Sequence, residues 1–276
     1  FEKNGAKKLS AFLDDAKLKY DISVNDFLEN PGLKLTELVK PSIFRKALKL
    51  DVFKSVEKDI CKRFTSNKAR SILTFPSLFL GAMPNKIPSL YTMMNHADLS
   101  LGTWYPENGM NSLAKALETI AVKNGAVFHY NSPVEGITVK NNLATGVTVG
   151  GDFKTFDTII SGADYHHTEQ ILLDKEFRKY NAKYWDSRKM APSSLIFYLG
   201  INKKVEGLSH HNLFFDEDLD LHGKEIYENP AWPVKPLFYV CCPSKTDVNV
   251  APKGMENLFV LIPIATDLED SEQIRS

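Results

Sequence analysis

The spacing of apolar residues predicts that the first hundred residues are mainly helical. Leu9, Phe12, Leu13 and Ala16 recur at the i, i+3, i+4 and i+7 spacing of an amphipathic helix over residues 5–19, with Lys and Asp on the other faces. The same spacing returns between interruptions by Pro and Gly. Further helices are therefore predicted over residues 23–28, 35–39, 42–50, 51–63 and 67–73.

Strands and helices alternate between residues 102 and 175. A helix is predicted after Asn108, because apolar residues then follow one face as far as Ile120, and Gly125 is a suitable residue to end it. Strand-forming residues on both sides of Asn141-Asn142 predict a hairpin. A further helix is expected at 166–173, and strands are expected at 103–105, 126–129, 133–139, 143–149, 153–156 and 157–160.

The last hundred residues have the pattern of an antiparallel sheet. Residues 216–236 are polar and contain Pro, which predicts a long connection. Strands rich in β-branched and aromatic residues are predicted at 194–200, 211–215, 237–242 and 258–264. We therefore expect an α/β (α+β) fold with a mainly helical part at 1–101, a mixed part at 102–175 and an antiparallel-sheet part at 176–276.

Composition narrows the class of partner. Lys and Arg number 34, as do Asp and Glu, so no net charge attracts nucleic acid, and we expect no nucleic-acid partner. The three cysteines, two of them adjacent, suit a reducing compartment, which predicts a cytoplasmic protein. The chain begins with Phe1 rather than Met, and we interpret it as a piece of a longer protein.

The longest apolar stretch, residues 72–94, contains three prolines and so does not predict a transmembrane helix. Two interpretations remain for it. Phe79 and Met83 belong to a group of large apolar residues there that could line a channel for an apolar ligand or touch a membrane surface. Alternatively, the same residues are ordinary core.

Histidine and cysteine do not predict a metal site. The pairs His166-His167 and His210-His211 are adjacent, so the two members of each pair should point apart on a helix or strand. No H-E-x-x-H or C-x-x-C spacing occurs, and Cys241-Cys242 is interpreted as packing. The sequence also contains no G-x-S-x-G nucleophile motif and no phosphate-binding P-loop.

A series of short motifs, in order, resembles the phytoene desaturase family of the FAD-dependent amine oxidase-like superfamily. The matching segments in the middle of the chain are Tyr105-Pro106, Asn108-Gly109-Met110, Pro133-Val134 and Ile159-Ile160-Ser161-Gly162-Ala163-Asp164. Later matches are His210 to Phe215, Pro243 to Asp247 and Ala251 to Gly254. The resemblance covers most of residues 70–266. The family's G-x-G-x-x-G fingerprint is absent from the sequence, and Asn108 replaces the first Gly of a usual pair.

The resemblance implies a partial FAD-binding domain at 102–175, joined to a substrate domain made of the helical and sheet parts. It places Val134, Gly162, Ala163 and Asp164 at the cofactor, FAD, of the full-length protein. The alternatives are that Val134 is a buried strand residue and that Asp164 caps a helix. Substrate contacts implied by the resemblance are Tyr105, Asn108, Gly109, Met110, Phe79 and Met83, and Met110 could equally face the core.

The function implied is that of an oxidoreductase acting through its cofactor. The resemblance implies removal of a hydride and a proton from an apolar polyisoprenoid or carotenoid substrate, forming a C=C bond, with no catalytic side chain assigned. It also allows peripheral contact with the inner face of the membrane, and it leaves the oligomeric state open. The fragment alone is expected to be inactive. Alternatives are a carotenoid isomerase, a retinol-saturase type flavoprotein, and a non-catalytic prenyl-binding protein of the GDP-dissociation-inhibitor type.

Overall fold

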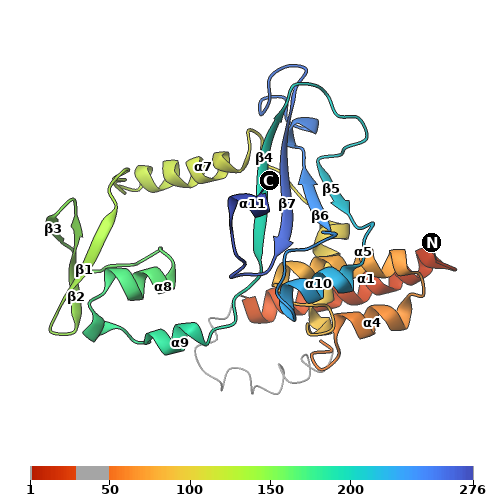
Figure 1. Cartoon of the computed structure of the whole chain (residues 1–276), viewed down its shortest axis with the longest axis horizontal. Helices are drawn as coiled ribbons and strands as arrows, with labels where there is room; N and C mark the ends of the chain where they lie inside the picture. Colours follow the sequence, from red (N-terminus) through yellow and green to blue (C-terminus); the bar gives the residue numbers. More distant parts are fainter. Residues whose placement is uncertain (1, 29–49, 276) are drawn as a thin grey trace. The chain divides into compact units, whose positions relative to one another are not determined.

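A computed structural model describes residues 2–28 and 50–275 of the chain (Figure 1). The chain divides into two compact units. The discontinuous unit contains Phe1–Leu113 and Ala191–Ser276, and the central unit contains Ala114–Met190. The helices predicted at 35–39 and 42–50 lie outside the described residues, apart from Leu50, which is in a turn. The domain boundaries predicted at 102 and 175 differ from the limits of these units, and their assignment stays a prediction.

Helices form the first part of the discontinuous unit. Helix α1, Gly5–Ile22, continues directly into η1, Ser23–Leu28, so the predicted break near residue 20 is wrong. The reason is that the Ser23 N–H bonds the carbonyls of Lys19 and Tyr20 and so prolongs the helix. Helix α4 is shorter than predicted because Ser55 caps it by accepting the Lys58 N–H. The remaining elements of this part are α4 Val56–Arg63, α5 Asn67–Thr74, η2 Phe75–Leu80, η3 Ser89–Thr92, α6 Met93–His96 and η4 Ala97–Leu101.

The apolar faces of these helices meet in one core. Phe12 of α1 and Phe64, just after α4, meet edge to face with ring centroids 5.9 Å apart. Aromatic rings in this arrangement add to the stability gained from burial. The predicted face of α1 is confirmed at Phe12 and Ala16, which are buried. The buried residues of the core cluster are Phe12, Val56, Ile60, Phe64, Leu73 and Ile87.

A charged pair is buried beside this core. The Lys19 Nζ and Asp59 Oδ2 atoms lie 3.5 Å apart, and both side chains are completely buried. Ser89 joins them, because its hydroxyl donates to Asp59 at 2.9 Å and accepts from Lys19 at 3.1 Å. Arg63 Nε donates to Asp59 at 3.0 Å. Buried charges are tolerated only when they are paired and hydrogen-bonded, so this network fixes α1, α4 and η3 against one another.

The second part of the discontinuous unit is a four-stranded antiparallel sheet. Figure 1 shows its strands side by side in the order β4-β7-β6-β5. All four strands predicted from the last hundred residues are therefore confirmed and lie in one sheet. Their bounds are β4 Ser193–Ile201, β5 His211–Phe214, β6 Phe238–Cys241 and β7 Glu256–Ile264.

The polar connection predicted at 216–236 contains a helix that the sequence interpretation missed. Helix α10, Leu219–Tyr227, begins where Asp218 accepts the backbone N–H groups of Asp220 and Leu221. Gly223 lets this helix pack closely on Met83, whose side chain occupies the space that a Cβ at residue 223 would need. The other short elements in this unit are η7 Pro243–Lys245 and α11 Glu272–Arg275.

The central unit contains the predicted hairpin. Asn141 and Asn142 both have positive φ, 51° and 61°, as a two-residue hairpin turn requires. Gly125 ends α7 as predicted, since its N–H bonds Val122 and the next N–H, of Ala126, reaches Ala121. The elements are α7 Met110–Lys123, whose first turn belongs to the discontinuous unit, and β1 Val134–Lys140, β2 Leu143–Val149, β3 Asp152–Thr155, α8 Tyr165–His167, η5 Thr168–Leu172, η6 Lys175–Phe177 and α9 Ala182–Asp186.

Three predicted strands, at 103–105, 126–129 and 157–160, are wrong. These segments are extended or irregular, and within residues 2–28 and 50–275 none of them pairs with a strand. A strand needs a neighbour for its N–H and C=O groups, so strand-forming residues alone do not make one. Apolar side chains in two of them stay exposed, Val127 at 77% and Ile160 at 91%. Helix α7 likewise buries none of its residues.

No helix among the described residues is long and apolar enough to span a bilayer.

Replacing Asp59 with Asn should destabilise the discontinuous unit strongly. The variant removes the fully buried carboxylate that Lys19, Lys54 and Arg63 share. Because Asp15 stays 3.1 Å from Lys19, the loss should be about 3 kcal/mol, the lower end of the cost of breaking a buried pair. Asp21→Asn is the matched control, because Asp21 pairs with Lys17 at the surface and its loss should cost less than about 1 kcal/mol. Urea unfolding at neutral pH measures both. If the two variants lost the same unfolding free energy, burial of the Asp59 pair would not explain its contribution to stability.

Acid should also lower the stability of the discontinuous unit, because the Asp59 carboxylate becomes protonated. Burial tends to raise the pKa of this carboxyl, but the hydrogen bond from Lys54 and the charges of Arg63 and Lys19 outweigh it and lower the pKa from 3.8 to about 2. A pKa below the unfolded value stabilises the fold above about pH 4, and this contribution is lost as the pH falls toward 2. The free energy of unfolding should therefore fall more steeply in this range for the parent than for Asp59→Asn. If the unfolding free energies of the parent and of Asp59→Asn fell in parallel over this pH range, Asp59 would not be the source of the acid sensitivity.

Candidate functional site

An open hollow of about 490 Å³ lies in the discontinuous unit. One wall is the loop before α7, a second is the start of β5, and a third is the loop after η7. The residues that line it are Thr103, Trp104, Tyr105, Glu107, His210, His211, Thr246, Asp247, Val248 and Asn249. A hollow of this size, with polar groups set among aromatic rings, has room for a small ligand.

Asp247 holds two of these walls together. Its Oδ2 accepts the backbone N–H of Asn108 at 2.8 Å, and its Oδ1 accepts that of Asn249 at 2.9 Å. The turn just before α7 needs left-handed backbone at two successive positions, with φ of 65° at Asn108 and 88° at Gly109. Asn adopts this conformation more readily than most residues, and Gly adopts it without strain. The replacement of a usual Gly by Asn108 is therefore accommodated.

Tyr105 connects the loop to the sheet. Its ring meets the ring of His210 edge to face, with centroids 4.6 Å apart. A Cβ on Gly109 would lie 3.2 Å from the Tyr105 hydroxyl, so a larger residue there would press on this ring. Tyr105, Asn108 and Gly109, three of the predicted substrate residues, are therefore neighbours at one side of the hollow.

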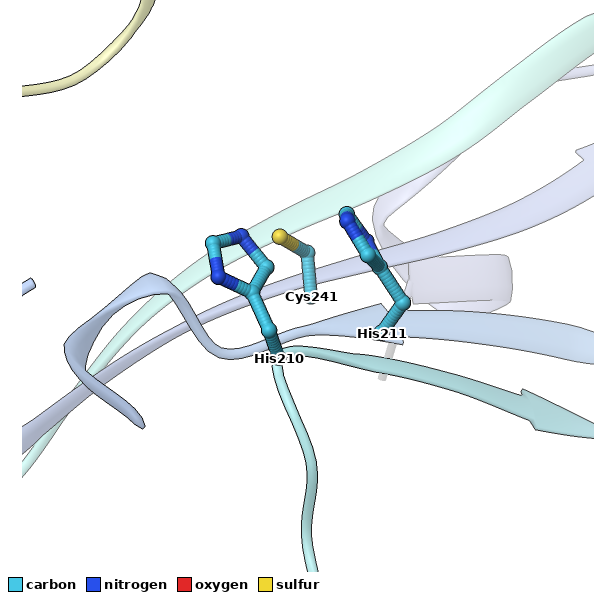
Figure 2. A group of neighbouring side chains, drawn as sticks. All are labelled: His210, His211 and Cys241. Carbon is cyan, nitrogen blue, oxygen red and sulfur yellow. The ribbon is translucent and has the colours of Figure 1, made fainter. Parts of the chain in front are cut away.

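The histidines at the start of β5 lie beside a cysteine. The register between β5 and β6 places His211 opposite Cys241, and the His210 carbonyl accepts the Cys242 N–H at 2.7 Å. One ligand-capable atom from each of His210, His211 and Cys241 lies within 4.8 Å of the other two. Figure 2 shows the two rings and the sulfur gathered above the strands. The prediction that this histidine pair points apart is wrong, because His210 precedes the strand and escapes its alternation.

Hydrogen bonds orient both rings. His210 Nδ1 lies 2.6 Å from Thr246 Oγ1, and His211 Nδ1 lies 2.6 Å from Tyr239 Oη. The other nitrogen of His210, Nε2, is buried and has no hydrogen-bond partner. Burial, together with the neighbouring His211, lowers the pKa of His210 and so disfavours the charged form of its imidazole. Burial likewise raises the pKa of the Cys241 thiol.

Of the predicted substrate residues, the lining includes Tyr105, while Asn108 and Gly109 stand in the same loop outside the lining and the other three lie elsewhere. Met83 is 8% exposed and packs against Gly223 of α10, as a core residue would. Met110 begins α7 and is 63% exposed. Phe79 belongs to η2, and its side chain lies outside the described part of the chain. None of these three belongs to the residues that line the hollow.

The residues predicted at the cofactor lie in the central unit. Val134 begins β1, an edge strand, and is 39% exposed rather than buried. A Cβ on Gly162 would meet no atom within 4 Å, so the chain itself leaves space there. Asp164 caps α8 by accepting the His167 N–H at 3.0 Å, which confirms the capping interpretation. An exposed strand edge and an open turn of small residues fit one side of a site for an extended nucleotide.

Sequence reasoning missed the polar side of the hollow. His210, Thr246 and Asp247 stand in segments that matched the family motifs, but no role followed from the motifs themselves. The available signal was that polar residues stand at the ends of two predicted strands, His210 just before 211–215 and Thr246 and Asp247 soon after 237–242. Cys241 gave no signal, because its position opposite His211 depends on strand register.

This chain resembles known proteins along nearly all of its length. A family model described as flavin containing amine oxidoreductase matches residues 10–275. A carotenoid 3,4-desaturase from Haloarcula japonica is 34% identical over 276 residues, which is 100% of this chain and 56% of that protein. A zeta-carotene-forming phytoene desaturase from Myxococcus xanthus is 28% identical over 255 residues, which is 92% of this chain and 49% of that protein. The chain thus spans about half the length of these relatives.

A solved structure supports the fold. The crystal structure of an oxidoreductase from Methanosarcina mazei matches with a TM-score of 0.53 and 18% identity, over 77% of this chain and 48% of that chain. Such low identity bears on the fold alone, and it confirms the predicted mixture of helices and antiparallel sheet. Because the family model extends over nearly the whole sequence and the relatives include phytoene desaturases, this chain belongs to the flavin-containing amine oxidoreductase family, among its phytoene desaturase-like members.

Proposed function

We propose that the full-length protein is an FAD-dependent oxidoreductase that forms C=C bonds in a polyisoprenoid of the carotenoid class. The observation that carries this proposal is the 34% identity to a carotenoid 3,4-desaturase along the entire chain. The phytoene desaturase from Myxococcus xanthus supports the same substrate class. A bound flavin supplies the chemistry, since it can accept a hydride from a saturated carbon.

The chain's own contribution is to bind and orient an apolar substrate. A polyisoprenoid has no charged group, so contact with apolar and aromatic side chains must provide most of its affinity. Two large apolar residues of the hollow are strongly exposed, Trp104 at 87% and Val248 at 86%, and they suit this task. We assign substrate contact to Tyr105, Asn108 and Gly109 at the hollow, and keep Met110, Phe79 and Met83 as proposed contacts.

Val134 and the turn Gly162-Ala163-Asp164 are the proposed contacts to FAD. The open edge of β1 offers backbone groups, and the turn allows close approach of the nucleotide because its side chains are small. The sequence contains no G-x-G-x-x-G loop, so these residues form one part of the proposed site and do not hold the pyrophosphate. We further propose that the protein works in the cytoplasm and takes its apolar substrate at the inner face of the membrane.

Three other functions are distinguishable by experiment. A carotenoid isomerase and a retinol-saturase type flavoprotein would share the cofactor but change the substrate differently. A non-catalytic prenyl-binding protein would hold the substrate unchanged. The names of the relatives favour the desaturase, because the proteins from Haloarcula japonica and Myxococcus xanthus are both named as desaturases.

The absorbance of the carotenoid should identify the reaction. A desaturase lengthens the conjugated system, so the purified full-length protein should move the substrate's absorbance to longer wavelength as new C=C bonds form. An isomerase leaves the number of double bonds unchanged, and a saturase moves the absorbance to shorter wavelength. Mass spectrometry should show a loss of two hydrogens for each bond. Product of unchanged mass, or product that has gained hydrogen, would refute the proposal.

Adding a side chain at Gly162 should remove the cofactor without unfolding the protein. A Cβ there meets no protein atom within 4 Å and the φ is ordinary, so the chain tolerates Gly162→Val, whereas the proposed nucleotide does not. Gly200→Val is the matched control, because Gly200 also has open space around its Cα but lies in β4. We expect the flavin-to-protein ratio to fall at least about tenfold in the first variant only. Equal flavin content in both would remove Gly162 from the proposed site.

A further inference from the structure

We propose that His210, His211 and Cys241 form a binding site for a divalent cation of the zinc class, separate from the flavin chemistry. The three side chains offer two imidazole nitrogens and one sulfur within 4.8 Å of one another. Donors around tetrahedral zinc lie about 3.5 Å apart, given bond lengths of about 2.0–2.3 Å. A separation within 4.8 Å is close enough for rotation of the side chains to bring the donors to that spacing around an ion.

The backbone already holds these side chains together. His211 and Cys241 are directly paired across β5 and β6, and neighbouring strands keep such pairs close. His210 is held at the end of the same ladder by the hydrogen bond from Cys242 to its carbonyl. A site formed on paired strands needs little ordering of the chain when the ion binds, which favours affinity.

The hydrogen bonds of the rings are those of metal-binding histidines. Such residues use one nitrogen for the ion and the other for an oxygen that fixes the ring. Thr246 Oγ1 and Tyr239 Oη each occupy an Nδ1, which leaves Nε2 of both rings available. Nε2 of His210 is buried and has no partner. A buried polar atom of this kind is unusual, and a bound cation would satisfy it.

The donor set selects the ion. Among the common divalent cations, thiolate and imidazole together suit zinc, whereas magnesium and calcium prefer oxygen ligands. Three protein ligands leave the fourth tetrahedral position open to water or to a ligand in the hollow that His210 and His211 help to line.

A second cluster in the described part of the chain has a different explanation. Asp15, Asp51 and Asp59 also lie close together. Lys19 contacts all three carboxylates, at 3.1, 3.5 and 3.5 Å, and Arg63 contacts Asp15 at 2.7 Å. Protein cations therefore already occupy the position that a metal ion would take. No comparable cation contacts the His210, His211 and Cys241 group in the described structure.

Cobalt(II) titration of the metal-free full chain tests the site. Cobalt bound by a thiolate gives a sulfur-to-metal charge-transfer band in the near ultraviolet, and tetrahedral coordination gives strong visible bands. We expect both, and we expect stoichiometric zinc to abolish them. Cys241→Ser should lose the charge-transfer band, and His210→Asn should weaken binding at least about tenfold. The bands are read as a difference from the spectrum of the same protein without cobalt, so the absorbance of bound flavin cancels and no activity is needed.

Matched variants separate this site from adventitious binding. Cys61→Ser removes an exposed thiol in α4, and His166→Asn removes a histidine from the other adjacent pair, so both should titrate like the parent. Tyr239→Phe removes the oxygen that orients His211 and should weaken binding by about 10–100-fold. Circular dichroism establishes that each variant is folded. A parent without the charge-transfer band, or an unchanged band in folded Cys241→Ser, would overturn the proposal.

Discussion

The hydrogen-bonded register between β5 and β6 is the constraint on which the candidate site depends. It places His211 opposite Cys241 and Leu213 opposite Tyr239, so that the Tyr239 hydroxyl can reach the His211 ring. The chain then leaves β6 through η7, which brings Thr246 to His210 and Asp247 to the backbone of Asn108. A slip of one residue would turn Cys241 and Tyr239 to the opposite face and take both away from His211.

Buried polar contacts fix the two parts of the discontinuous unit in different ways. In the helical part, Lys19 and Asp59 are completely buried and satisfy each other through Ser89. In the sheet part, Glu256 is buried at the start of β7, where Lys245 of η7 reaches it at 2.7 Å. Since unpaired buried charges are costly, each contact allows few alternative packings. The loop after η7, which forms one wall of the hollow, is thereby attached to the sheet through Lys245 and Glu256.

Much of the fold was predictable because it depends on local rules. The apolar stripe that includes Phe12 and Ala16 gave α1, and the Asn141-Asn142 turn gave the hairpin. The predictions failed where a distant partner decides the outcome. Residues 126–129 and 157–160 contain strand-forming side chains, but no strand pairs with them in the described chain. Helix α10 was missed because the signal at Asp218 is a capping contact within a polar stretch. For the site, the motifs marked Tyr105 and Asn108, whereas Cys241 required the register of two strands.

The most direct test of flavin-dependent desaturation is a single turnover without oxygen. Full-length protein with oxidised flavin would be mixed with an acyclic carotenoid, and both the flavin and the product would be quantified. Desaturation by hydride transfer predicts that flavin is reduced in an amount equal to the C=C bonds formed. Bond formation with the flavin still oxidised, or carotenoid bound and recovered unchanged by a colourless protein, would contradict it.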